Sequence, residues 1–117
     1  MKQLDIRKYI FDIKEACELL LQFTVGKTFS DYSTDPMLRS AVERQFEIIG
    51  EALVQALRLD PSLSSRISNP GRIIAFRNRL IHGYSSVADD IVWGIVQANL
   101  PTLRKEVATL MEELNNV

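Results

Sequence analysis

Apolar side chains recur at intervals of three and four residues through most of this chain, and no segment alternates convincingly between apolar and polar residues. A spacing of three and four places side chains on one face of an α-helix, whereas a half-buried strand requires a period of two. In the first predicted helix, residues 4–23, this stripe consists of Ile6, Tyr9, Ile10, Ile13, Cys17, Leu20 and Phe23. We therefore expect an all-α protein without strands.

Aspartate-proline pairs indicate where later helices begin. Asp35-Pro36 and Asp60-Pro61 each place an N-cap acceptor before the residue whose fixed φ suits the first helical position. They predict a second long helix from residue 36 and a short helix after residue 60. A short helical turn is also expected around residues 29–32, in the connection before the second long helix.

Two glycines give further signals. Gly50 lies inside the second long helix, where it costs about 1 kcal/mol relative to alanine. A close approach of another helix at that point would offset this cost. Gly83 predicts the end of a third long helix, which Ser68-Asn69-Pro70 opens and which runs to about His82.

The last part of the chain contains a proline within helical periodicity. Ser86 and Asp89 have the spacing of a capping box and predict a fourth helix that begins near residue 86. Pro101 removes a helical hydrogen bond and should kink this helix or split it. Because the connections are short, we expect an antiparallel bundle of four to five helices in a single domain, residues 1–117.

The composition is that of an ordinary globular domain, since the 117 residues are 46% apolar and 25% charged. A domain of this length buries roughly 65% of the surface that its unfolded chain exposes. No apolar run approaches the ~18 residues of a membrane span, and the charged N-terminus does not resemble a signal peptide, so we expect a cytoplasmic protein without a membrane partner. The single Cys17 falls in the apolar stripe and should be buried. One histidine and one cysteine do not predict a metal site.

The charge distribution singles out one segment. The net charge is only −1, from 14 basic and 15 acidic residues, which argues against general adhesion to nucleic acid. Residues 61–88 nevertheless contain four arginines and no carboxylate, so this window carries +4 and the rest of the chain −5. The four are Arg66, Arg72, Arg77 and Arg79. This concentration predicts a specific site for an anion.

Side chains suited to chemistry lie at the end of the third predicted helix. On a helix that advances about 100° per residue, Arg77 falls in the apolar row, where a buried charge requires a partner. Asn78, Arg79 and His82 share a polar patch, because three or four residues separate His82 from each of the others. Arg77 and His82 differ by about 140° in direction. They converge on one ligand only if the helix loosens at its end or a second copy of the chain contributes.

The same side chains have an ordinary structural explanation. His82 would then interact favourably with the dipole at a helix C-terminus, and Arg77 would pair with a carboxylate of the bundle. Arg79 would be a solvated charge and Tyr84 a packing residue. The spacing alone leaves both explanations open.

Three segments resemble a known family. RNRLIHGY, residues 77–84, is similar to the signature of the HepT-like toxins in the HEPN superfamily, an arginine, four residues, a histidine, one residue and a tyrosine. AVERQFEIIGEAL, residues 41–53, looks like that family's second-helix signature, and DIVWGIVQANLPTL, residues 90–103, looks like its segment after the motif. The resemblance covers nearly the whole chain in order.

The resemblance implies a homodimeric helical bundle that acts as an endoribonuclease toxin, in a toxin-antitoxin pair of the type VII kind. Arg77 and His82 from both subunits would be catalytic across the twofold axis, without a metal or another cofactor. Asn78 and Arg79 would support this site or bind phosphate. A minimal nucleotidyltransferase antitoxin would neutralise the toxin by transferring AMP to Tyr84.

Two other functions fit the same residues. The chain could be a noncatalytic nucleotide-binding or interaction subunit of a nucleotidyltransferase, whose arginines hold a nucleotide phosphate. It could also be a helical dimerisation module, in which replacement of Arg77 or His82 would be silent. RNA cleavage that persists in EDTA and is lost in His82→Ala would distinguish the ribonuclease from both.

Overall fold

The computed structural model describes residues 2–83 and 87–116. These residues form α1 (Lys2–Thr24), α2 (Phe29–Thr34), α3 (Pro36–Leu59), the 3₁₀ helix η1 (Pro61–Ser65), α4 (Pro70–His82), α5 (Asp89–Ala98) and α6 (Leu100–Asn115). No strand occurs among them, so the all-α prediction is confirmed. The described residues contain six α-helices instead of four to five, because the turn expected at residues 29–32 is a short helix and the last helix is split.

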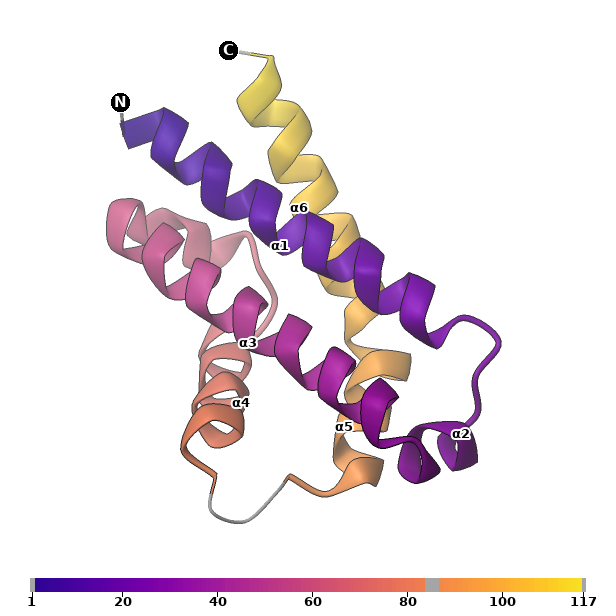
Figure 1. Ribbon diagram of the computed structural model, residues 1–117. Coiled ribbons are helices and arrows are strands. Elements are labelled where there is room, and N and C mark those ends of the chain that lie inside the picture. Colours follow the sequence, from indigo (N-terminus) through magenta and orange to yellow (C-terminus); the bar gives the residue numbers. More distant parts are fainter. Residues whose placement is uncertain (1, 84–86, 117) are drawn as a thin grey trace.

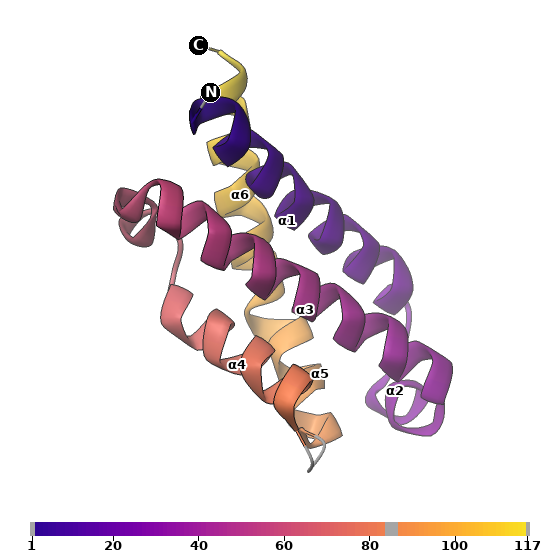
Figure 2. The same ribbon diagram turned by 60° about the vertical axis from the view of Figure 1, so that its left-hand side comes forward.

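The long helices α1 and α3 run in opposite directions and form the centre of the bundle (Figure 1). α6 also packs against α1, and α5 contacts both α2 and α6. α4 lies at the edge of the bundle beside α3, as Figures 1 and 2 both show. None of the described helices combines the length and hydropathy that a membrane crossing requires.

The helix starts follow local chemistry in most cases. The Asp35 carboxylate accepts hydrogen bonds from the backbone N–H groups of Met37 and Leu38, at 3.0 and 3.2 Å. At the next predicted start, the Asp60 carboxylate accepts from the N–H of Ser62 at 3.1 Å. These bonds satisfy N–H groups that have no partner within their own helix, as the Asp-Pro pairs predict.

The last predicted helix differs from expectation at its start and agrees at its split. α5 begins at Asp89 with Ala88 as N-cap, so the expected start near residue 86 is wrong. Ala88 has no side-chain acceptor, and the acidic residues Asp89 and Asp90 instead complement the positive end of the helix. Ser86 lies outside the described residues. The helix is interrupted at Asn99, and Pro101 lies in the first turn of α6, where its missing N–H costs nothing.

The core combines buried apolar stripes of α1, α3 and α6. α1 contributes the fully buried Ile10, Ile13 and Leu20, and α3 contributes Ile49 and Leu53. Cys17 is buried among them, as its place in the stripe predicts. Burial raises the pKa of its thiol to about 12, so this group is an inert thiol at neutral pH.

One polar group in the core is unusual. Tyr32 of α2 is fully buried, and its ring packs edge-to-face on Trp93 of α5 with centroids 5.5 Å apart. Its hydroxyl has no hydrogen-bond partner among the described residues. Burial, with a contribution from Glu43, raises the pKa of this phenol, so it stays protonated and inaccessible.

Candidate functional site

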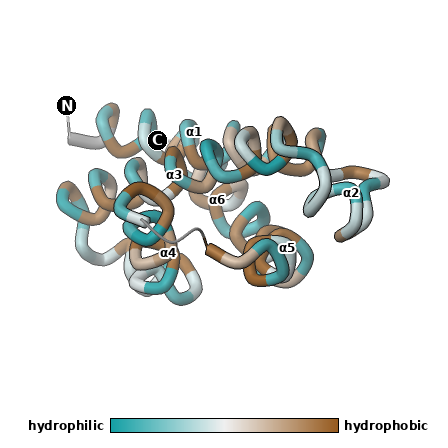
Figure 3. Tube along the Cα trace, turned by 60° about the horizontal axis from the view of Figure 1, so that its bottom comes forward, coloured by the Kyte–Doolittle hydropathy of each residue, from teal (hydrophilic) through white to brown (hydrophobic). Residues whose placement is uncertain are grey.

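The helix that carries the predicted site is poorly covered by the rest of the chain. α4 is amphipathic, yet none of its side chains is buried. Its apolar residues Ile73, Ile74, Phe76 and Leu80 are only partly covered, and Ile81 is 42% exposed. Figure 3 shows hydrophobic and hydrophilic residues side by side along α4, at the edge of the molecule. The helix therefore offers apolar as well as polar surface to another molecule.

Arg77 is held by two neighbours. Its side chain is 21% exposed and pairs through Nη2 with the Glu51 carboxylate of α3. Nη1 donates to the side-chain oxygen of Asn78 at 2.8 Å. The Glu51 carboxylate also accepts from the Gln55 amide at 3.2 Å. Arg77 thus has the carboxylate partner that its place in the apolar row requires, and the guanidinium is held in one orientation.

Gly50 allows this arrangement. A Cβ atom at residue 50 would lie 2.2 Å from Cβ of Arg77 and 2.5 Å from its Cγ. Real Cβ atoms do not approach other carbons so closely, so only glycine lets α4 lie this near α3. The predicted close approach at Gly50 is confirmed, and the approaching residue is Arg77 itself.

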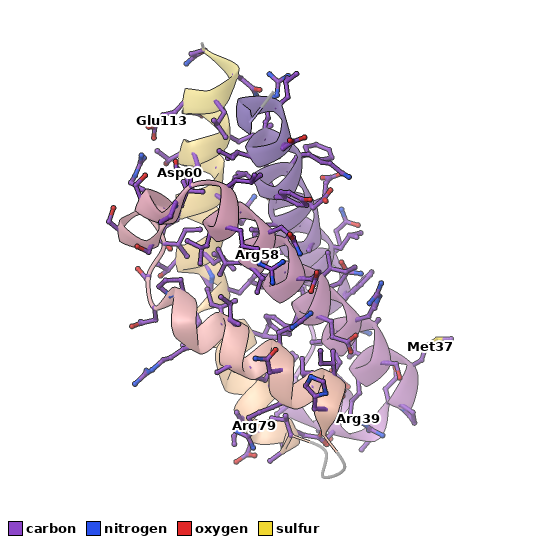
Figure 4. All side chains as sticks on the ribbon, turned by 90° about the vertical axis from the view of Figure 1, so that its left-hand side faces the viewer. Met37, Arg39, Arg58, Asp60, Arg79 and Glu113 are labelled. Carbon is purple, nitrogen blue, oxygen red and sulfur yellow. The ribbon has the colours of Figure 1, made fainter. Side chains whose placement is uncertain are left out.

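His82 is the last residue of α4 and is exposed. It makes no hydrogen bond or ion pair with the described part of the chain. Arg79 is exposed one turn earlier, and Figure 4 shows it at the lower end of α4. α4 stays helical to His82 and ends at Gly83, so Arg77 and His82 keep their separation of about 140° around the helix. One chain therefore does not bring these two side chains together.

The four arginines of the basic window divide into two groups. Arg66 pairs with Glu113 of α6 and lowers the pKa of that carboxyl group, and Arg77 pairs with Glu51. Arg72 and Arg79 form no ion pair with any described residue. The two arginines of the basic window that lack an ion pair with a described residue therefore both lie on α4.

Two further predictions concern Tyr84 and metal binding. Tyr84, the predicted acceptor of AMP, lies outside the described residues. In the part of the chain whose side chains are described, no three His, Cys, Asp or Glu residues gather closely enough to hold a metal ion.

One contact of the candidate site was not found from the sequence. The sequence requires a partner for Arg77 but does not show that this partner is Glu51. The available signal was the position of Glu51, directly after the glycine at which a close helix approach is expected.

Comparison with known proteins places the chain in one family. The model of the family described as ribonuclease HepT-like matches residues 13–110. The chain belongs to this family. It is similar to "Putative RNase TTE0752" of Caldanaerobacter subterraneus subsp. tengcongensis, with 33% identity over 92% of this chain and 95% of the relative. It is also similar to "Probable ribonuclease HepT" of Thermococcus cleftensis, with 34% identity over 84% of this chain and 88% of the relative.

A third relative is "Putative RNase MJ1380" of Methanocaldococcus jannaschii, with 30% identity over 92% of this chain and 97% of the relative. The match extends over nearly the full length of all three proteins, so it includes α3 and α4 together. No solved structure matches the chain significantly.

Proposed function

We propose that this HepT-like protein is an endoribonuclease that cleaves RNA without a metal ion, with Arg77 and His82 as catalytic residues. The observation that carries the proposal is the fixed Arg77, held half-buried by Glu51 and Asn78 on the same helix that ends in an exposed His82. Membership of a ribonuclease family and relatives named as RNases support it.

The chemistry needs only groups that RNA and this chain supply. The ribose 2′-oxygen attacks the adjacent phosphorus and loses its proton to a base, the bond from phosphorus to the 5′-oxygen breaks, and that oxygen receives a proton from an acid. Histidine can serve as base or acid near neutral pH. A guanidinium stabilises the negative charge that develops on the phosphoryl oxygens. His82 and Arg77 fit these roles, with Asn78 and Arg79 as supporting phosphate contacts.

A single chain offers one histidine, whereas this reaction uses both a base and an acid. A twofold dimer would supply two copies of His82 and two of Arg77. The incomplete cover of α4 supports an interface that includes this helix. We expect light scattering at micromolar concentration to give the mass of two chains, and a monomer would contradict the proposed site.

The direct test of the activity is cleavage of RNA in the presence of EDTA. We expect the purified protein to retain its rate in EDTA and to leave a 2′,3′-cyclic phosphate or its hydrolysis product, because no step requires a metal. Gel electrophoresis with analysis of the product ends measures both. Activity that disappears in EDTA and returns with magnesium would overturn the mechanism.

We also propose that the protein is a toxin whose activity a nucleotidyltransferase antitoxin suppresses by transferring AMP to Tyr84. Tyr84 lies two residues beyond His82 in the sequence. AMP attached there would be a bulky anion that binds the arginines of the site and excludes the RNA phosphate. Of the other two tyrosines, Tyr32 is fully buried and Tyr9 lies on α1 outside the basic window. After incubation with ATP and the partner, mass spectrometry should find AMP on Tyr84. AMP on Tyr9 or Tyr32 in its place would refute this.

A further inference from the structure

A groove of about 470 Å³ lies between α4 and the α5–α6 pair. Its apolar lining includes Phe46, Ile73, Phe76, Ile95, Leu100 and Leu103. The volume is within the range of roughly 300–1,000 Å³ in which proteins hold small organic ligands. Nothing in the catalytic proposal uses this groove, because Arg77 and Glu51 do not line it.

Polar groups at the rim of the groove suit a nucleobase. Asn69 caps α4 and Asn99 precedes α6, and neither makes a capping hydrogen bond with its side chain. A carboxamide presents both donors and an acceptor, which match the mixed donors and acceptors on the edge of a base. Thr102 adds a hydroxyl at the same rim. The groove therefore combines apolar walls for the faces of a base with free polar groups for its edge.

The charges around the groove favour an anion beside that base. Arg72, in the first turn of α4, lines the groove and has no ion pair with a described residue. The first turn of α4 contains no acidic residue, so its positive end is not neutralised locally. The one carboxylate of the lining, Glu106, is engaged by Ser68, whose N–H donates at 3.0 Å and whose hydroxyl donates at 2.7 Å.

Arg72, which lines the groove, is one of several exposed cations on α4. On an ideal helix, Arg72, Arg79 and His82 fall within about 80° of one another, on the side of α4 away from Arg77. Arg72 and His82 are ten positions apart, which is about 15 Å of helix rise. An RNA backbone that follows this side of α4 would pass from His82 towards Arg72 and the groove, and the Arg77 that contacts its phosphate would come from the second copy of the proposed dimer.

We propose that this groove binds one nucleobase of a single-stranded RNA substrate, and that Arg72 contacts the adjoining phosphate. The inference rests on the proposed function, because it assigns a base-binding subsite to that reaction. The base lies between the apolar walls, and Asn69 and Asn99 contact its edge. The groove residues then set a preference for the base at one position of the cleavage site.

Binding is tested with RNA that cannot be cleaved. The probes are four homopolymeric pentanucleotides that carry a 2′-O-methyl group at every ribose, which removes the nucleophile. In nitrogen-15 NMR spectra of the full chain, we expect at least one probe to shift the side-chain amide signals of Asn69 and Asn99. Thr102→Trp, which fills the rim, and Arg72→Glu should each weaken binding of that probe by about tenfold or more.

The matched control is Arg58→Glu, which makes the same change in charge at an exposed arginine of α3 that does not line the groove (Figure 4). Arg58→Glu should change the affinity for the RNA probe by less than threefold. Equal weakening by Arg58→Glu and Arg72→Glu would show general charge attraction and overturn the subsite. Unchanged affinity for the probe in Thr102→Trp would also overturn the subsite. If Thr102→Trp does not fold, Asn99→Ala is measured in its place.

Two outcomes separate the subsite from the proposed function. If unmodified RNA is cleaved and Thr102→Trp alters neither binding nor the preferred cleavage position, the subsite is wrong and the nuclease stands. If the probes bind in the groove but unmodified RNA is never cleaved, the subsite stands and the nuclease is wrong. A wild-type dimer that becomes monomeric in Thr102→Trp would show that the groove is an interface between copies, which also refutes the subsite.

Discussion

His82→Ala is expected to lower the rate of RNA cleavage by about 10² to 10⁴-fold, the loss that follows removal of a general acid or base. The fold should be unaffected, because His82 is exposed at the end of α4 and bonds no described group. Single-turnover cleavage at saturating enzyme measures the chemical step separately from binding. Circular dichroism and light scattering check that the variant folds and keeps the oligomeric state of the unmodified protein.

Arg58→Ala provides the control for His82→Ala, since it removes an exposed cationic side chain from α3. It should lower the rate by less than threefold. If the His82→Ala protein retained more than a tenth of the cleavage rate, a role of His82 in proton transfer would be excluded. If neither the unmodified protein nor the variant cleaves RNA while both bind a nucleotide, the chain is a noncatalytic nucleotide-binding subunit.

Much of the fold follows from local signals in the sequence. Asp35 and Asp60 cap the helices that their Asp-Pro pairs predict, and Pro101 splits the last helix. These features depend on bonds between residues close in sequence, so short segments are sufficient to predict them. Ser86 and Asp89 show the limit of this approach, since α5 begins two residues later than a capping box there would require.

The sequence predicts that Arg77 needs a carboxylate partner but not which carboxylate this is, for a physical reason. Periodicity places Arg77 in the apolar row and shows that it needs a carboxylate, because this depends on one helix alone. The identity of that carboxylate depends on how α4 docks on α3, which no pattern within either helix states. Gly50 marks where a helix approaches, and only the fold shows that α4 approaches with Arg77 and thereby reaches Glu51.

Gly50→Ala is therefore expected to destabilise the protein, although alanine is the better helix former. The new methyl group would lie 2.2 Å from Cβ of Arg77, an atom fixed to the backbone, so α4 would have to move. Overpacking costs up to about 3 kcal/mol and the gain in helix propensity is about 1 kcal/mol, so we expect a net loss of about 2 kcal/mol. Gly94→Ala in α5, where nothing lies within 4 Å of the new Cβ, should instead stabilise by up to about 1 kcal/mol. Urea denaturation measures both changes, and an equal gain in the two variants would show that α3 and α4 are not in close contact at Arg77.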